Sequence, residues 1–222
     1  MIWDWTYARD ILPDMAAASL VTLQATVLGF VLALVLGLLW AVIGLTRVPI
    51  LGFTVRLMVQ FLRSTPLLIQ LFAAYYFLPV WGIYLPAMAT GVLVLGFHYS
   101  AYCAEVYRAG LNDVPRGQWE AARAINLSPL ATLRRIILPQ AVPPVIMPLG
   151  NYFVAMFKET PVLLAITVIE LVATARIIGN DTFRYTEPIT LAGLFFLLFS
   201  LITARAVRYA SERAQPPGRQ RV

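Results

Sequence analysis

The sequence predicts an all-α membrane protein with about five transmembrane helices. Hydrophobic residues make up 60% of the chain and charged residues only 13%, whereas about one quarter of the residues of a soluble domain are charged. The charged residues are also concentrated in a few places, and long stretches contain none. A soluble core would instead need polar residues distributed at the period of helices or strands. We therefore expect the 222 residues to form a single membrane domain.

Uncharged runs locate the expected spans, because a helix needs about 17 to 25 residues to cross a bilayer. The runs are Met15–Thr46, Ser64–Ala104, Ile136–Phe157 and Pro188–Ala204. The second is too long for one crossing, and the prolines, glycine and tryptophan of LPVWGIYLP (78–86) are typical of a turn at the membrane surface. The predicted spans are therefore about 15–45, 53–78, 86–107, 140–158 and 188–206, followed by a disordered tail at about 212–222.

The arginines predict the orientation of these spans. Cytoplasmic loops of membrane proteins carry an excess of Lys and Arg. With the N-terminus outside and the C-terminus in the cytoplasm, most arginines fall on the inner side. The inner set is Arg47, Arg56, Arg108, Arg116, Arg123, Arg134, Arg135, Arg205, Arg208, Arg213, Arg219 and Arg221, and the outer set is Arg9, Arg176 and Arg184.

Two predicted spans have unusual composition. The first contains Gly29, Gly37 and Gly44, and small residues allow helices to approach closely in lipid. The fourth begins with Pro139, Pro143, Pro144 and Pro148, which we expect to prevent a regular helix.

The segment 161–178 is apolar but is interrupted by Glu170. Leu171, Val172 and Ala175 recur with Val168 at helical spacing, and this pattern places Glu170 elsewhere on the circumference. A sixth span would move the arginine-rich tail outside. We prefer a re-entrant or interfacial helix on the outer side, although a sixth span stays open.

A polar insertion at 113–139 is expected to form two short helices joined by a bend. Pro115 can open the first helix, and Ser128 followed by Pro129 is an N-cap followed by a helix-starting proline. Asn126 lies between them, where a left-handed residue is needed, and asparagine tolerates that conformation.

The sequence EAARAINLSPLATLRRIILP (120–139) resembles the EAA loop of ABC importer permeases, with Asn126 in place of the family's glycine. RSTPLLIQLF (63–72), AYCAEVYRAG (101–110), VPRGQWEAA (114–122) and PLGNYFVAMFKETPVL (148–163) are similar to the polar amino-acid branch of these permeases. The sequences INLS (125–128) and GNYFVAMFKETPVLLAITVIEL (150–171) most resemble ectoine and hydroxyectoine permease subunits. The resemblance implies a MetI-like fold and import of a small polar zwitterion.

The resemblance also implies that the insertion is a coupling helix-turn-helix that docks on a cytoplasmic ATPase. Trp119, Ala122 and Leu127 would offer apolar contacts, and Arg116, Glu120 and Arg123 polar ones. The alternative is an amphipathic pair of helices lying on lipid headgroups. The full expected coupling set is Arg116, Gly117, Trp119, Glu120, Ala121, Ala122, Arg123, Asn126 and Leu127.

The partners follow from the same resemblance. They are an ABC ATPase dimer that binds ATP and Mg²⁺, a second permease subunit or second copy of this chain, an extracellular solute-binding protein, and membrane lipid. Lys158 is the chain's lysine and no Gly-Lys-Ser/Thr is present, so a standard Walker A site is excluded. We expect no cofactor in this chain and no nucleic-acid partner. One cysteine, Cys103, and one histidine, His98, exclude an internal disulfide and a His/Cys metal cluster.

Polar residues inside the predicted spans are candidates for the solute path, because charges in a bilayer are costly. Lys158 and Glu159 could meet the carboxylate and the cationic centre of a zwitterion; equally, Lys158 could reach the outer headgroups and Glu159 could face water. Gln70 and Asn151 are further candidates, since an amide facing lipid would lack partners. Arg63 completes this set, although an arginine near the inner interface usually extends to the headgroups or pairs with a neighbouring helix.

An intramembrane enzyme and a stand-alone channel or carrier are the alternatives to a permease of the bacterial inner membrane. An intramembrane serine protease would need a catalytic constellation, and the chain has one histidine and no G-x-S-x-G sequence. A stand-alone channel or carrier would leave the long EAA-like insertion unexplained. We therefore expect a transporter subunit without catalytic residues.

Overall fold

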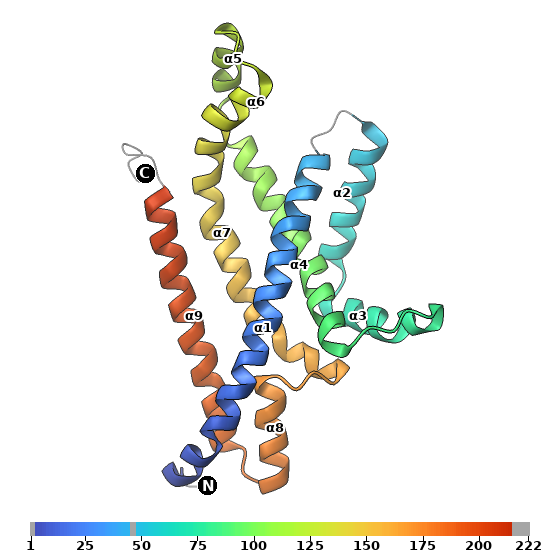
Figure 1. Ribbon diagram of the computed structural model, residues 1–222, viewed down its shortest axis with the longest axis vertical. Helices are drawn as coiled ribbons and strands as arrows, with labels where there is room; N and C mark the ends of the chain where they lie inside the picture. Colours follow the sequence, from blue (N-terminus) through green and yellow to red (C-terminus); the bar gives the residue numbers. More distant parts are fainter. Residues whose placement is uncertain (1–2, 45–47, 215–222) are drawn as a thin grey trace.

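The computed structural model describes residues 3–44 and 48–214, and within them it contains helices and no strands. The bundle that they form is long and narrow (Figure 1). Its long helices are α1 (Trp5–Gly44), α4 (Ala87–Asn112), α7 (Leu138–Glu159) and α9 (Thr186–Ala214). Within the described ranges, α1, α4 and α9 are long and apolar enough to cross a membrane, and two bent helix pairs raise the candidate spans to five. The all-α membrane fold is thereby confirmed.

Shorter helices occupy the sides and ends of the bundle. α5 (Arg116–Ala124) and α6 (Pro129–Thr132) form a hairpin at one end, and α8 (Leu171–Thr182) lies at the other end, near the N-terminus (Figure 1). α2 (Pro49–Ser64) flanks α1 and α4. The remaining short pieces are α3 (Leu67–Phe72), η1 (Ala73–Phe77), η2 (Leu78–Trp81), η3 (Leu133–Ile137) and η4 (Thr160–Ile166).

α1 and α4 pack closely along their length because small residues meet between them. A Cβ atom added to Gly37 would lie 2.6 Å from Cys103 Cβ and 2.9 Å from the Ser100 carbonyl oxygen, so no larger residue fits without movement. Gly29 also faces α4, whereas no atom of the described residues lies within 4 Å of a Cβ added to Gly44. The predicted close contact is therefore made by Gly29 and Gly37 and not by Gly44.

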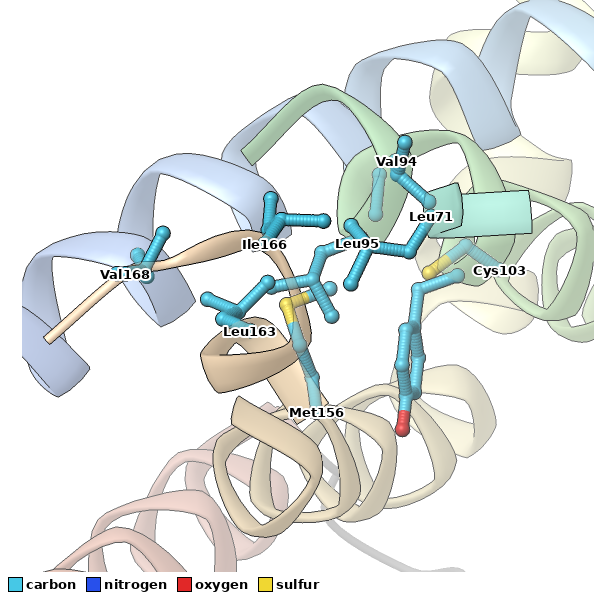
Figure 2. Packing of buried hydrophobic residues seen from close by; sticks show 11 residues of the cluster. Leu71, Val94, Leu95, Cys103, Met156, Leu163, Ile166 and Val168 are labelled. Atoms are coloured by element: carbon cyan, nitrogen blue, oxygen red, sulfur yellow. The ribbon is translucent and has the colours of Figure 1, made fainter. Parts of the chain in front are cut away.

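The main core lies where α1, α3, α4 and α7 meet (Figure 2). Leu71, Leu95, Met156 and Leu163 have no exposed surface, and they come from α3, α4, α7 and η4. This cluster joins the sideways-projecting α3 segment to the bundle. It therefore positions the polar residues that lie beside it.

The second predicted span, 53–78, is broken at Pro66. The helical axes of Pro49–Ser64 and Leu67–Trp81 differ in direction by 107°. Thr65 is extended, with φ −108° and ψ 138°, as the residue before a proline prefers. The continuous span that the hydropathy suggests is therefore two helices with a sharp corner.

The fourth predicted span is a continuous helix, contrary to the expectation from its prolines. α7 runs from Leu138 to Glu159 with Pro143, Pro144 and Pro148 inside it. The proline ring fixes φ near the helical value, so the cost is limited to missing N–H donors and local crowding. The irregularity lies just before this helix, where residues 133–137 form the π-helical turn η3.

The segment after α7 bends by 53° before α8. Thr167 is left-handed, with φ 66°, and α8 begins only at Leu171. Glu170 is not on a polar helix face: it has no exposed surface and caps α8 by accepting a hydrogen bond from the Ala173 N–H at 2.7 Å. The expected helical pattern beginning at Val168 is therefore wrong for its first residues.

The last helix, α9, extends further than predicted. The expected disordered tail starts at about 212, but α9 continues to Ala214. The remainder of that tail, 215–222, with Arg219 and Arg221, lies outside the described residues, as does Arg47.

Candidate functional site

The α5–α6 hairpin has the local structure that its sequence predicts. Asn126 is left-handed, with φ 54°. The N–H of Leu127 bonds to the Ala122 carbonyl at 3.0 Å and the N–H of Asn126 to the Arg123 carbonyl at 2.9 Å, which together form a Schellman motif. Ser128 Oγ then caps α6 by accepting from the Ala131 N–H at 3.3 Å. These caps fix the angle between the two helices.

A small apolar core attaches the hairpin to α7. Val114, Ile137 and Ala141 are buried together, and Trp119 and Leu133 pack against them. The Gln140 side chain adds a hydrogen bond of 3.3 Å to Gln118 Oε1. Packed side chains therefore connect α5 to α7, so that a displacement of α5 would also displace α7.

The expected contact residues divide into three groups by burial. Ala122 has no exposed surface, so it supports the hairpin from inside and cannot offer the apolar contact that was expected of it. Trp119 and Leu127 are half-buried. The remaining members of the expected set are exposed: Arg116, Gly117, Glu120, Ala121, Arg123 and Asn126.

Two exposed apolar residues of the hairpin were missed in the sequence. Ile125 is 68% exposed and Leu130 is 73% exposed. Ile125 directly precedes the left-handed Asn126, and Leu130 lies in the first turn of α6. The closeness of both residues to the predicted bend is the signal that the sequence offers.

A polar cluster joins α4 and α7, and its carboxylate, Glu159, is exposed. The Tyr99 hydroxyl donates to Glu159 Oε2 at 2.8 Å. Tyr102 and Tyr152 lie beside it, with ring centroids 5.2 Å apart, and the Tyr99 and Tyr152 centroids are 6.3 Å apart. The cluster thus combines one carboxylate with three aromatic faces.

Arg63 borders this cluster. Its guanidinium carbon lies 5.4 Å from the centroid of the Tyr102 ring. Arg63 Nη1 is 4.0 Å from Glu105 Oε2, and Glu105 also forms a close ion pair with Arg108. Arg63 therefore has partners on α4, which agrees with the expectation that an arginine near the inner interface pairs with a neighbouring helix. It also lies close to the predicted solute path.

The Gln70 side chain stabilises the corner that precedes α3. Pro66 has no N–H, so the Leu62 carbonyl loses its helical partner. Gln70 Nε2 donates to that carbonyl at 2.8 Å and to Thr65 Oγ1 at 2.6 Å. Gln70 Oε1 lies 3.2 Å from His98 Nδ1, so the amide is occupied at both ends by protein.

Lys158 and Glu159 are neighbours in sequence but face different helices. Glu159 meets Tyr99 of α4, whereas Lys158 lines a cavity of about 360 Å³ with Phe196, Leu197 and Ser200 of α9. No carboxylate lies within 4.0 Å of Lys158 in residues 3–44 and 48–214. Asn151 is exposed on α7. The structure therefore separates the two charges that were expected to hold one zwitterion.

The end of the bundle opposite the hairpin is held by a charged clamp that the sequence did not reveal. Arg184 Nη1 lies 3.3 Å from Asp4 Oδ2, and Arg184 Nη2 lies 2.6 Å from Glu187 Oε1. The Arg184 guanidinium also covers the Tyr7 ring, 4.1 Å from its centroid. These contacts tie the start of α1 to the α8–α9 turn.

Comparison with known proteins identifies the family. A family model described as "Binding-protein-dependent transport system inner membrane component" matches residues 9–215. The "Probable amino-acid ABC transporter permease protein y4tG" of Sinorhizobium fredii is 44% identical over 202 residues, which cover 91% of this chain and 87% of that protein. The "L-cystine transport system permease protein TcyB" of Bacillus subtilis is 34% identical over 95% of this chain and 90% of that protein.

Solved structures agree. A chain of an amino acid ABC transporter solved with histidines matches with a TM-score of 0.89 and 30% identity, over 96% of this chain and 100% of that chain. The MetNI methionine ABC transporter matches with a TM-score of 0.73 at 20% identity, over 93% and 97%, and so shows the fold alone. The expected MetI-like fold is confirmed. The chain therefore belongs to the family of binding-protein-dependent inner-membrane transport components, and it is an ABC transporter permease subunit, not an enzyme.

Proposed function

We propose that this chain carries a small zwitterionic solute, an amino acid or an ectoine-like compound, across the bacterial inner membrane. The names of the relatives support this solute class, since y4tG is a probable amino-acid permease and TcyB an L-cystine permease. The observation that carries the proposal is the Glu159 carboxylate, held by Tyr99 at 2.8 Å beside the rings of Tyr102 and Tyr152.

The chemistry of this cluster suits an ammonium or amidinium group. A carboxylate in a membrane protein usually lines a polar path and pairs with a cation. Aromatic faces add attraction for a desolvated cation. We assign the cationic centre of the solute to Glu159 and its carboxylate to Arg63, which already borders the Tyr102 ring at 5.4 Å. Lys158 and Asn151 stay outside this assignment, and Lys158 is tested separately.

The hairpin is the proposed contact with the motor. Arg116, Glu120 and Arg123 are exposed on α5, and Ile125 and Leu130 add apolar surface at the turn. Charged groups around an apolar patch are suited to a specific protein contact. The partners are an ABC ATPase dimer, a second permease subunit or second copy of this chain, and an extracellular solute-binding protein. ATP and Mg²⁺ would bind to the ATPase.

The proposed orientation places the hairpin in the cytoplasm and the N-terminus outside. The end of α9 lies at the same end of the bundle as the hairpin, and the N-terminus lies at the opposite end (Figure 1). The arginines of the hairpin and of α9 therefore gather on one side, in agreement with the excess of positive charge on cytoplasmic loops. A Ser128→Cys variant tests this orientation. Labelling of its cysteine by an impermeant maleimide only after the cells are opened would support a cytoplasmic hairpin.

Uptake measurements test the solute class. The permease, reconstituted in liposomes with its ATPase and binding protein, is given labelled ectoine or labelled amino acids together with ATP. ATP-dependent uptake of one of them is the expected result, and failure to transport any zwitterion would overturn the proposal. The chain alone should move no solute; unaided transport would favour the stand-alone carrier instead.

A further inference from the structure

A basic cavity opens between α1, α2 and α4 at the hairpin end of the bundle. Its volume is about 450 Å³. Arg56 and Arg63 of α2 and Arg108 of α4 line it, together with one carboxylate, Glu105. Three guanidinium groups against one carboxylate leave a surplus of two positive charges. Arg63 is also assigned to the solute carboxylate, but neither the coupling hairpin nor the Tyr99–Glu159 cluster uses Arg56 or Arg108.

Within residues 3–44 and 48–214, Glu105 neutralises only part of this positive charge. Glu105 faces both Arg63, at 4.0 Å, and Arg108. Within the described residues, no carboxylate lies within 4.0 Å of the Arg56 guanidinium. The Arg63 and Arg108 side chains keep 38% and 52% of their surface exposed. The cavity therefore presents open guanidinium groups, whose planar forks match phosphate oxygens.

Apart from Gln60, the rest of the lining is apolar. Val55, Val59 and Ala104 are buried together beneath the arginines, and Trp40 packs against them. The Trp40 Nε1–H is already donated to Ser100 Oγ at 3.1 Å, so its ring meets the cavity as an apolar surface. A free anion in water would gain no binding energy from these apolar residues, whereas an amphiphile would bury apolar surface against them.

The outer faces of α1 and α2 continue the apolar surface away from the arginines. Leu38 and Val42 of α1 are each 52% exposed, and Leu57 and Phe61 of α2 are 59% and 61% exposed. An acyl chain can lie along such faces in the bilayer. Basic pockets between membrane helices recognise anionic lipid headgroups. We infer that this cavity binds an anionic phospholipid, with its phosphate at Arg56 and Arg108 and its chains against α1 and α2.

The test measures lipid selectivity and does not depend on transport. The full-length chain is reconstituted in phosphatidylcholine vesicles that contain a trace of spin-labelled phosphatidylglycerol or spin-labelled phosphatidylcholine. The fraction of immobilised label gives the relative association of each lipid with the protein. We expect the anionic label to be favoured by about fivefold for each engaged arginine, and the preference to weaken with salt.

Two kinds of variant separate the cavity from general surface charge. The double substitution Arg56→Gln and Arg108→Gln should bring the preference close to one, because Arg63 is left to pair with Glu105. The matched control, Arg205→Gln and Arg208→Gln, removes two exposed arginines of α9 and should keep most of the preference. Gly44→Phe leaves the charge unchanged and places a ring in the cavity, because Gly44 lines it and no described atom lies within 4 Å of a Cβ at that position; it should also reduce the preference.

Three outcomes would overturn the inference. The first is a preference that survives both cavity variants or falls equally in the α9 control. The second is binding of inorganic phosphate by the solubilised chain without preference for the anionic lipid, which would assign the cavity to a free anion. The third is efficient cross-linking of an Arg56→Cys variant to a second copy in the vesicles, which would show that another chain covers the cavity.

Discussion

Gln70 repairs the hydrogen bond that Pro66 removes, because its side-chain Nε2 lies 2.8 Å from the carbonyl oxygen of Leu62. That carbonyl is four residues before the proline, so it would otherwise lack a helical partner. The repair also holds α3 against α4, since Gln70 Oε1 lies 3.2 Å from His98 Nδ1. The corner of the second membrane segment therefore depends on one amide side chain.

Gln70→Leu should destabilise the protein while leaving it inserted in the membrane. The substitution leaves the part-buried Leu62 carbonyl without this partner, and an unsatisfied acceptor of this kind costs about 1 kcal/mol, the low end of the range for buried groups. The midpoint of thermal unfolding in detergent should fall. Gln60→Leu is the control, because Gln60 is exposed and its amide donates to the Ser64 hydroxyl of the same helix at 3.1 Å; an equal fall in both variants would contradict the role of Gln70.

Glu120→Lys should weaken association with the ATPase and abolish transport. Glu120 is exposed on α5, so the substitution reverses a surface charge without opening the hairpin core. Co-purification of the two subunits and ATP-driven uptake measure the effect. Asp181→Lys makes the same change on an exposed residue at the other end of the bundle and should leave co-purification intact. Normal co-purification and uptake by the Glu120 variant would remove the coupling assignment.

Glu159→Gln should lower uptake more than Lys158→Met does. The glutamine still accepts from Tyr99, but it loses the charge that would face the cationic solute, and a charge-assisted hydrogen bond contributes about 1.5 to 3 kcal/mol. We therefore expect uptake to fall by about tenfold or more. Subunit assembly, measured by size-exclusion chromatography, should be unchanged in both variants.

The opposite ranking would reverse the assignment of the cationic site. If Lys158→Met abolishes uptake and Glu159→Gln does not, the solute passes beside α9 rather than beside Tyr99. Normal uptake kinetics in the Lys158 variant would agree with a lysine that extends toward the outer headgroups.

The contacts of Arg184 with Asp4 and Glu187 should make the free energy of unfolding depend on pH. The Tyr7 backbone N–H, which donates to Asp4 Oδ1 at 3.2 Å, is the main cause of a lowered pKa for the Asp4 carboxyl; partial burial opposes it and Arg184 adds to it. A pKa lowered by folding means that the unfolded state binds the proton more readily. The stabilisation is therefore complete above the ordinary aspartate pKa of about 4 and is lost as the pH falls through the lowered value.

Asp4→Asn tests this pH dependence. The variant should melt below the natural protein at pH 7, and the difference should shrink as the pH is lowered below about 4. Differential scanning fluorimetry in detergent measures both. Asp10→Asn is the control, because Asp10 is exposed and makes no ion pair in the described residues. A difference that is constant from neutral to acid pH would contradict the assigned role of the Asp4 charge.

Local features of this protein could be predicted residue by residue. The left-handed Asn126 and the Ser128 cap depend only on backbone conformations and hydrogen bonds a few residues away, so they are visible in the sequence. The membrane class was equally visible, because the absence of charge over long runs is a property of composition.

Other features needed the packed helices. Ala122 is buried, and Gln70 is engaged by Leu62 and His98, because of neighbours that no local pattern specifies. The same is true of the basic cavity, whose arginines come from α2 and α4.

What the sequence alone determined, then, is which segments enter the membrane, where the hairpin bends and which family its motifs resemble. Only the tertiary structure decided that Lys158 and Glu159 face different helices and that Arg184 closes the far end on Asp4. The physical reason is that hydropathy and capping act over a few residues of one chain segment. Partners of a side chain are set by helix packing, which joins residues far apart in the sequence.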